Sequence, residues 1–243
     1  MTENQIREQI CEIGRRIYEK GMVAANDGNI SVKLNEKEYL CTPTGVSKGF
    51  MTPECICKIA FDGQVLEAQN GFLPSSEIKM HLRVYQKRPD VTAVVHAHPE
   101  FATAFAIEGI PLNRPIMSEA VVSLGCVPIA EYGLPSTSEI PDALEPYLSY
   151  FDAVLLEYHG ALTWGSNLTE AYYRMESVEL YARLLYRTMQ IGNSRELDGT
   201  TVARLCQLRE NAGMSNPQSV CSNRNLHFQS CKECSRHWME EEK

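Results

Sequence analysis

The sequence predicts an α/β layer fold in which a mainly antiparallel sheet carries helices on its faces. Short segments with alternating apolar residues follow one another early in the chain and are joined by tight turns. Segments with helical periodicity lie before, among and after them. The chain has 243 residues, 44% of them hydrophobic, which fits one sizeable core on which both kinds of element pack.

The first third of the chain contributes a helix and then strands. Apolar residues recur at spacings of three to five over the first twenty residues, which predicts an amphipathic helix closed by Gly21. Alternating segments predict four short strands, the last two joined by a turn at residues 62–63. These strands are Ile30–Leu34, Tyr39–Thr42, Ile56–Phe61 and Gln64–Leu66.

The rest of the predicted domain alternates between helices and buried strands. Helices are expected over Ser75–Lys87, over Pro99–Ile107, and over Thr169–Met189 with Thr169 near the N-cap. Strands are expected over Val91–His98, Val127–Ala130 and Ala153–Leu156. After about Gly213 apolar periodicity fades and polar residues dominate. We therefore expect a domain over residues 1–212 and a polar tail over residues 213–243.

Composition excludes several classes of function. The formal net charge is −8 and no long basic run occurs, so we expect no nucleic-acid partner. No apolar stretch is long enough to cross a membrane, and the first residues lack a signal-peptide core. Nine cysteines without a secretion signal are typical of reduced thiols in the cytoplasm.

Two histidines one residue apart, His96 and His98, end a run of β-branched residues. Side chains alternate faces along a strand, so both imidazoles point the same way, and Pro99 ends the strand beyond them. His159 also follows a buried-looking strand, and Gly160 permits a tight turn there. Three imidazoles at strand ends fit an open zinc site, although packed histidines would give the same local patterns. For His81, inside a predicted helix, we expect a structural or surface role.

Three turns carry residues that suit an anion. Ser75 or Ser76 can cap the helix that follows, and the amides of a helix N-terminus suit a phosphate. The segments Asp27–Ser31 and Thr42–Gly45 each place a glycine beside a hydroxyl or amide group, which allows close backbone approach. Ordinary turn chemistry would explain each segment taken alone.

In combination these motifs resemble the class II aldolase and adducin family, and within it the L-fuculose-1-phosphate aldolases. The motifs share the order and spacing of that family over about residues 5 to 190: Gly28-Asn-Ile-Ser31, Thr42-Pro-Thr-Gly45, Pro74-Ser-Ser-Glu77, His96-Ala-His98 and His159-Gly160. The resemblance implies an αβα fold around an antiparallel sheet. It also implies a homotetramer with a divalent metal, usually zinc and one per subunit, near a subunit interface.

The resemblance also implies roles for the matched residues. His96, His98 and His159 look like the zinc ligands. Glu77 looks like the catalytic acid and base, and it can also ligate the metal in the empty enzyme. The phosphate cradle is implied for six residues of the turns: Gly28, Asn29, Thr44, Gly45, Ser75 and Ser76.

The implied activity is a zinc-dependent aldolase of fucose degradation. It would cleave a ketose 1-phosphate, such as L-fuculose 1-phosphate, to dihydroxyacetone phosphate and an aldehyde such as L-lactaldehyde. Zinc would stabilise the enediolate as a Lewis acid, and Glu77 would move the carbon-bound proton. No Schiff-base lysine is required, and no lysine occurs in these motifs.

Other activities remain open on the same scaffold. Pentulose-phosphate 4-epimerases of the family carry aspartate at the position of Glu77, whereas a methylthioribulose-1-phosphate dehydratase also uses glutamate. Aldolases for rhamnulose or 5-deoxyribulose 1-phosphate fit equally. A non-catalytic adducin-like interaction domain is an alternative of another class, although adducin heads lack the complete metal set. A zinc hydrolase has no resemblance to support it.

Two segments depart from the family pattern. The family often places a tyrosine from a neighbouring subunit on the substrate, but Ile110–Met117 contains none, and Tyr132 is the candidate substitute. The tail contains Cys231, Cys234 and His237 at a zinc-finger-like spacing, with Cys221 and His227 nearby. A structural metal site, a partner-binding or targeting segment, and incidental thiols in a disordered tail are all consistent with it.

Overall fold

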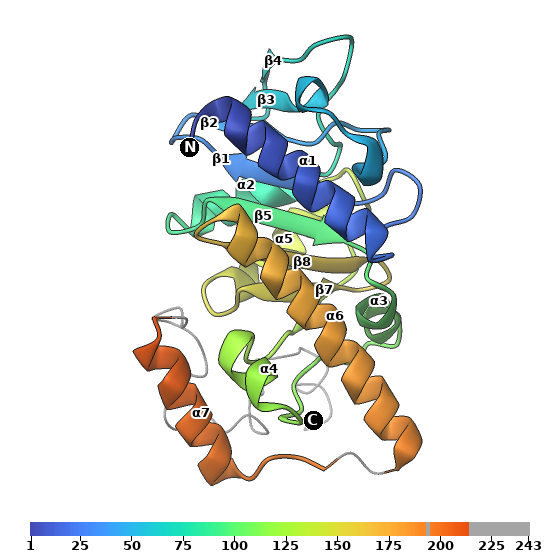
Figure 1. Ribbon diagram of the computed structural model, residues 1–243, viewed down its shortest axis with the longest axis vertical. Coiled ribbons are helices and arrows are strands. Elements are labelled where there is room, and N and C mark those ends of the chain that lie inside the picture. The colour runs from blue at the N-terminus through green and yellow to red at the C-terminus, as the bar shows by residue number, and fades with distance from the viewer. Residues whose placement is uncertain (193–194, 214–243) are drawn as a thin grey trace.

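A computed structural model describes residues 1–192 and 195–213 of the chain, and the candidate tail motif lies outside these residues. An eight-stranded sheet runs through the centre of the molecule in the order β4-β3-β2-β1-β5-β8-β7-β6 (Figure 1). Its strands are β1 (Asn29–Lys33), β2 (Glu38–Cys41), β3 (Cys57–Ala60), β4 (Val65–Glu67), β5 (Ala93–Ala97), β6 (Ile129–Ala130), β7 (Ala153–Leu156) and β8 (Gly160–Gly165).

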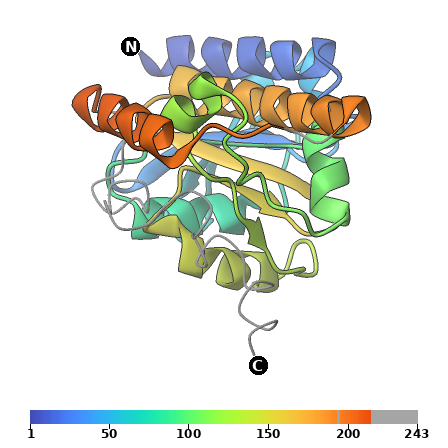
Figure 2. The same cartoon turned by 90° about the horizontal axis from the view of Figure 1, so that it is seen from below.

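Neighbouring strands of this sheet pair antiparallel, except β6 and β7, which run parallel among the described residues. Helices cover both faces of the sheet (Figure 2). On one face lie α1 (Glu3–Glu19), α3 (Glu100–Ile107) and α6 (Leu168–Ile191). On the other lie α2 (Ile78–Lys87) and α5 (Glu139–Leu148). The predicted α/β fold with an αβα arrangement of layers is therefore confirmed.

The alternation of side chains along β5 divides the molecule into two cores. Val95 and Ala97 belong to the apolar cluster under α1 and α6, whereas Val94 belongs to the cluster under α2 and α5. His96 lies two residues after Val94 and therefore faces the α2 side. The central strand thus brings an imidazole to the face on which α2 begins.

The first helix ends as the sequence predicts. Gly21 has a φ of +69°, and its N–H donates to the carbonyl of Tyr18, while the N–H of Met22 donates to the carbonyl of Ile17. These two bonds form a Schellman motif, which satisfies the last carbonyls of α1. The chain then turns back, and the carbonyl of Met22 accepts from the N–H of His98 (2.9 Å). The end of α1 therefore holds the residue that follows β5.

Several elements escape prediction from the sequence. The helix α5 contains Pro146 in its interior, yet Leu144 and Leu148 bury their side chains against the sheet and hold it in place. The strand β8 is buried along its whole length, so it shows no alternation. Two further helices, α4 (Ser118–Ser123) and α7 (Gly199–Asn211), pack against each other beyond β6. Among the described residues, no helix has the length and apolar character needed to cross a bilayer.

Candidate active site

Three histidines converge where β5 and β8 meet. His96 lies within β5, His98 follows that strand, and His159 lies in the short turn between β7 and β8. The imidazole ring centroids lie 4.8 to 5.0 Å apart in all three pairs. One ring nitrogen can be chosen from each histidine so that all three nitrogens lie within 4.8 Å of one another. The structure thus brings together the three residues that the sequence singles out as metal ligands.

Hydrogen bonds orient two of these rings with their Nε2 atoms toward each other. The Nδ1–H of His96 donates to the carbonyl of Ala161 (2.9 Å), so its Nε2 carries a lone pair. The Nδ1 of His98 faces the Asp27 carboxylate at 3.5 Å. The two Nε2 atoms lie 3.1 Å apart. Two ligands of a tetrahedral zinc with bonds near 2.0–2.1 Å lie about 3.3 Å apart, so this spacing suits a cation between them.

Burial favours the neutral, metal-binding form of two of these imidazoles, those of His96 and His159. His96 is 1% exposed, and burial lowers its pKa well below 6.5, with a further lowering by the neighbouring His98 and His159. Burial also lowers the pKa of His159, whose Nδ1 is buried without a hydrogen-bond partner. A neutral imidazole offers a ring-nitrogen lone pair, so the side chains of His96 and His159 are suited to ligate a divalent metal.

Glu77 lies against the same three-histidine group. Its Oε1 atom is 3.3 Å from the Nε2 of His159, and its Oε2 atom is 3.5 Å from the Nε2 of His96. The Nδ2 of Asn29 donates to Oε2 (2.9 Å). Asn29 can reach it because it pairs with His96 across β1 and β5, so both side chains point to one face. Glu77 is therefore placed both to ligate a metal and to move a proton beside it.

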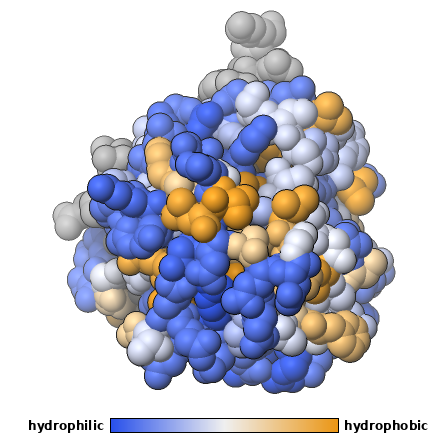
Figure 3. Space-filling view, turned by 90° about the horizontal axis from the view of Figure 1, so that it is seen from above, coloured by the Kyte–Doolittle hydropathy of each residue, from blue (hydrophilic) through white to orange (hydrophobic). Residues whose placement is uncertain are grey.

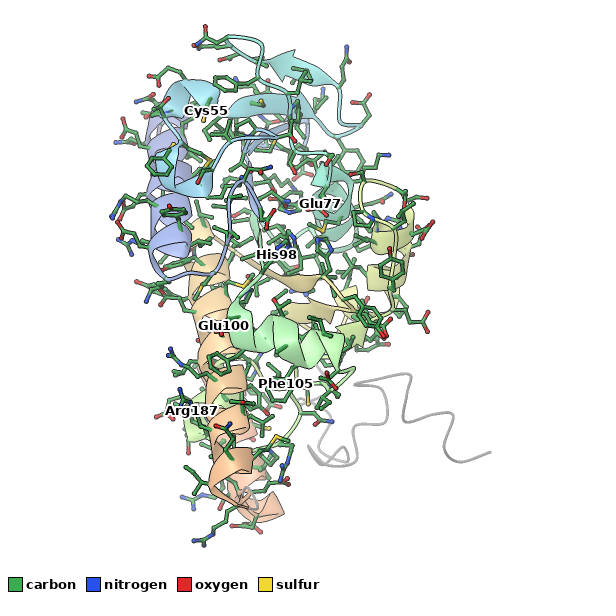
Figure 4. All side chains as sticks on the ribbon, turned by 90° about the vertical axis from the view of Figure 1, so that its right-hand side faces the viewer. Cys55, Glu77, His98, Glu100, Phe105 and Arg187 are labelled. Atoms are coloured by element: carbon green, nitrogen blue, oxygen red, sulfur yellow. The ribbon has the colours of Figure 1, made fainter. Side chains whose placement is uncertain are left out.

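The turn before α2 differs from its prediction in a way that explains this placement. The sequence predicts a helix from Ser75 with a serine cap, whereas α2 begins at Ile78 and Glu77 occupies the N-cap position without a side-chain cap. The Ser75 Oγ accepts from the N–H of Glu77 (3.4 Å), and the Ser75 N–H donates to the carbonyl of Thr42. The glutamate side chain is turned to Asn29 and the histidines instead, as Figure 4 shows for Glu77 and His98.

Two glycines permit the close approach of these segments. A Cβ atom on Gly160 would lie 2.5 Å from the carbonyl oxygen of Ala97 and 2.6 Å from the Cδ2 of His98. A Cβ on Gly28 would lie 2.9 Å from the carbonyl oxygen of His96, and its φ of +75° also favours glycine. Both glycines therefore let neighbouring backbone pack against the metal-binding strand.

A cavity of about 230 Å³ opens beside the histidines and Glu77. All six residues that the sequence indicates for a phosphate cradle line it. Hydroxyl groups come from Thr44, Ser75 and Ser76, and small or amide residues from Gly28, Asn29 and Gly45. Three turns far apart in the sequence therefore meet in one cavity. Because hydroxyl and amide groups can donate hydrogen bonds, this lining suits a phosphate.

Some residues of the cavity were given no role in the sequence prediction. Asp27, which only began a predicted turn, faces His98, and Pro135 and Ser136 come from the loop before α5. The loop before α5 carries no recognisable motif, so only the structure reveals its place. Tyr132, the candidate substitute for the family tyrosine, is 52% exposed and does not line this cavity in the described chain.

His81 has the structural role that the sequence allows for it. It is fully buried, its Nδ1 lies 2.7 Å from the Ser31 Oγ, and that hydroxyl lies 2.8 Å from the Tyr85 hydroxyl. Burial lowers the pKa of His81 to about 3, so it stays neutral in the folded protein. It packs beneath the site and does not line the cavity.

Comparison with known proteins gives consistent matches. The family model described as Class II Aldolase and Adducin N-terminal domain matches residues 8–186. The 3-oxo-tetronate 4-phosphate decarboxylase of Escherichia coli strain CFT073 is 32% identical over 212 residues, 86% of this chain and 97% of that protein. The L-fuculose phosphate aldolase of Methanococcus vannielii is 33% identical over 183 residues, 74% of this chain and 94% of that protein. A solved structure of L-fuculose 1-phosphate aldolase superposes with a TM-score of 0.79. It is 28% identical, and the match covers 86% of this chain and 98% of that one.

Proposed function

This chain belongs to the class II aldolase and adducin family, and we propose that it is a metal-dependent lyase that breaks a carbon–carbon bond beside the ketone of a small phosphorylated sugar derivative. The observation that carries the proposal is the cavity in which His98, His159 and Glu77 meet the hydroxyl-lined turns. One part of this cavity suits a metal and a proton transfer, and the other suits a phosphate.

Two named activities of the relatives converge on one intermediate. A 3-oxo-tetronate 4-phosphate has its ketone between a phosphorylated carbon and a hydroxyl-bearing carbon that carries the carboxylate. Loss of CO2 from that carbon leaves the enediolate of dihydroxyacetone phosphate. A ketose 1-phosphate that breaks between C3 and C4 leaves the same enediolate, with an aldehyde as the other product. In both reactions a proton added to carbon gives dihydroxyacetone phosphate.

The residues around the histidines fit this chemistry. A divalent metal, once bound, supplies Lewis-acid stabilisation of the negative charge that develops on the ketone oxygen. His96, His98 and His159 would hold it, and the Ala161 carbonyl fixes the ring of His96 for that task. The Glu77 carboxyl delivers the proton to carbon, and Asn29 keeps its Oε2 atom in place.

We propose decarboxylation of a 3-oxo-tetronate 4-phosphate as the first reaction to test and retro-aldol cleavage as the second. Decarboxylation needs one proton transfer, to the enediolate carbon. Retro-aldol cleavage also needs a base that takes the proton of the C4 hydroxyl, whose oxygen becomes the aldehyde carbonyl as the C3–C4 bond breaks. In the described chain, two carboxylates lie beside the histidines. Glu77 is near His96 and His159, and Asp27 is near His98. The decarboxylase relative also matches a longer part of this chain than the aldolase relative.

Cleavage of L-fuculose 1-phosphate in fucose degradation stays a proposal of the same kind, since aldolase relatives reach 33% identity. We also propose zinc as the metal and the cytoplasm as the location. The three-nitrogen donor set supports zinc. The free thiols of Cys11, Cys41, Cys55 and Cys57, in a chain with nine cysteines, support a reducing compartment.

We propose a homotetramer with the site near a subunit interface. Apolar surface is visible on the end of the molecule that Figure 3 shows. Within residues 50–73, Phe50 is 72% exposed and Leu73 is 62% exposed. Leu73 directly precedes the turn that carries Ser75 and Glu77. Tyr158, next to His159, is 63% exposed. Apolar surface beside a site is typical of a face that a partner subunit covers.

A substrate panel tests the proposed function. The zinc-loaded protein is mixed with 3-oxo-tetronate 4-phosphate and with the 1-phosphates of fuculose, rhamnulose and 5-deoxyribulose, and dihydroxyacetone phosphate is followed with a coupled reductase. We expect release from at least one substrate, lost on chelation and restored by metal. The dehydratase and epimerase alternatives predict turnover of other sugar phosphates without this product. If the protein binds metal but turns over none of these substrates, the result would contradict the proposed activity and favour an adducin-like binding domain.

A further inference from the structure

Lys48 is a buried lysine immediately behind the cavity. It begins the short helix η1 (Lys48–Phe50), three residues after Gly45, and it is 2% exposed. Its ammonium group donates to two backbone carbonyls, those of Asn26 (2.9 Å) and Val46 (2.7 Å). Burying a charged group is costly unless it has partners, so a lysine in this place calls for an explanation.

The two carbonyls belong to the two turns that form the phosphate side of the cavity. Asn26 lines the cavity in the turn that continues to Gly28 and Asn29, before β1. Val46 follows Thr44 and Gly45, in the turn after β2. The Lys48 ammonium therefore bridges the turns from behind and sets their spacing, while their other sides face the cavity.

The backbone of Lys48 is itself held by α1. A Cβ atom on Gly14 would lie 2.8 Å from the Lys48 carbonyl oxygen and 2.3 Å from the Cε of Met51, so α1 and η1 pack closely at this glycine. The end of α1 also holds the segment of His98 through the carbonyl of Met22. Helix α1 thus supports both the lysine and the metal-binding strand.

The charge of Lys48 is not balanced by an ion pair. Within the described residues its hydrogen bonds go to neutral carbonyls and no salt bridge is formed, although Asp27 acts on it from a greater distance. Burial lowers the pKa of Lys48 to about 8. The cavity lining contains no lysine or arginine in the part of the chain that the structure describes. A phosphate in the cavity would therefore receive a compensating positive charge from this side.

We propose that Lys48 is a positioning residue of the anion site, which fixes the two turns at the spacing that receives the phosphate and supplies that site with positive charge. This inference rests on the proposed function, because it needs a phosphorylated substrate in the cavity. A purely structural lysine would contribute to stability alone. Replacing a positioning residue also weakens phosphate binding in molecules that remain folded.

The test compares three variants of the zinc-loaded full chain. Lys48→Met removes the charge and both hydrogen bonds at similar length, whereas Lys48→Gln keeps an amide donor for the carbonyls and removes only the charge. Lys33→Met is the matched control, since the Lys33 side chain is 8% exposed and pairs with Glu36 at the other end of β1. Inorganic phosphate binding is measured by calorimetry, folding by thermal unfolding, and turnover on the best substrate by KM and kcat.

We expect both Lys48 variants to bind phosphate at least about ten-fold more weakly than wild type. Both lack the positive charge that attracts the phosphate in a partly buried site. KM should rise by a similar factor while kcat falls about three-fold or less, since a phosphate anchor acts in ground and transition states alike. Lys33→Met should keep the phosphate affinity of wild type.

Each other outcome overturns a defined part of the argument. Unchanged phosphate affinity in folded Lys48 variants overturns the role of Lys48 and leaves the proposed function standing. Failure of both Lys48 variants to fold makes the residue structural and likewise rejects the inference. If wild-type protein binds neither phosphate nor any substrate of the panel, the proposed function fails together with it.

Discussion

Two buried polar clusters in this molecule differ in how completely their groups are paired. At one, the Asp152 carboxylate, 4% exposed, forms ion pairs with Arg88 (3.0 Å), Arg174 (3.3 Å) and Arg209 (3.4 Å). At the other, the ring nitrogens of His96 and His98 face each other at 3.1 Å. Arg88 and Arg174 also pair with Asp90 (2.7 Å) and Glu170 (2.8 Å), so the charges of the first cluster are balanced within the chain. The second becomes balanced only when a cation is added, which is what a binding site requires.

The largest effect is expected from removing the proton carrier of the unbalanced cluster. Glu77→Gln keeps the size of the side chain and a donor or acceptor for Asn29, so the fold should remain intact. We expect kcat to fall by about 10² to 10⁴, the usual contribution of a general acid or base. Steady-state kinetics at constant bound zinc measure it. Glu77→Asp serves as the control, and a kcat for Glu77→Gln within a factor of three of wild type would contradict the assignment.

The balanced cluster should respond in stability instead. Asp152→Asn leaves three arginines around a neutral amide, and breaking a buried ion pair on one side typically costs about 3–5 kcal/mol of unfolding free energy. Urea unfolding measures the loss. Activity per folded molecule should stay near that of wild type. A folded Asp152→Asn protein with normal stability but low turnover would show that the two clusters do not divide their roles in this way.

Gly160→Ala tests how tightly the backbone holds the histidines. The new Cβ would meet the Ala97 carbonyl and the His98 ring, so His98 must move. We expect a loss of about 1–3 kcal/mol in stability, as for other overpacked sites, and about 10- to 100-fold weaker zinc binding, as for disturbed ligand support. Gly71→Ala is the control, because its φ of +75° strains the backbone without any nearby atom. Equal zinc affinity in both variants would refute the steric argument.

The smallest effect is a pH dependence at His81, the buried histidine outside the unbalanced cluster. Its pKa is about 3 in the folded protein against 6.5 for a free imidazole. Between these values the unfolded chain binds one more proton, so stability rises with pH. This amounts to about 1.4 kcal/mol per pH unit, or about 2 kcal/mol between pH 5 and 6.5. His81→Gln should lose this part of the slope in urea unfolding at several pH values, and an unchanged slope would contradict it.

Local patterns were enough to single out the three histidines that the fold brings together. The His-x-His spacing requires only that β5 is a strand, and the Gly21 end of α1 requires only one turn of backbone. The six residues predicted to bind phosphate came from motifs whose meeting in one cavity depends on the whole sheet. The family resemblance was needed to group these turns, because the sequence of one turn does not show which other turns lie beside it.

The remaining features depend on contacts between distant segments. The pairing of Asp27 with His98, the place of Ser136 in the cavity and the bridge made by Lys48 have no local signature. The helix α5 was missed because proline lowers helix propensity, whereas burial of its apolar face decides the outcome. The strand β8 was missed because a strand buried on both faces lacks alternation.

The central claim is that the unbalanced cluster forms and protonates the enediolate of dihydroxyacetone phosphate, whichever group leaves. The most direct test supplies dihydroxyacetone phosphate alone to the zinc-loaded protein in D2O and follows its hydroxymethyl protons by NMR. We predict that one of the two hydrogens exchanges for deuterium, that chelation stops the exchange, and that Glu77→Gln abolishes it. Exchange of neither hydrogen by a protein that binds both zinc and this ligand would contradict the account.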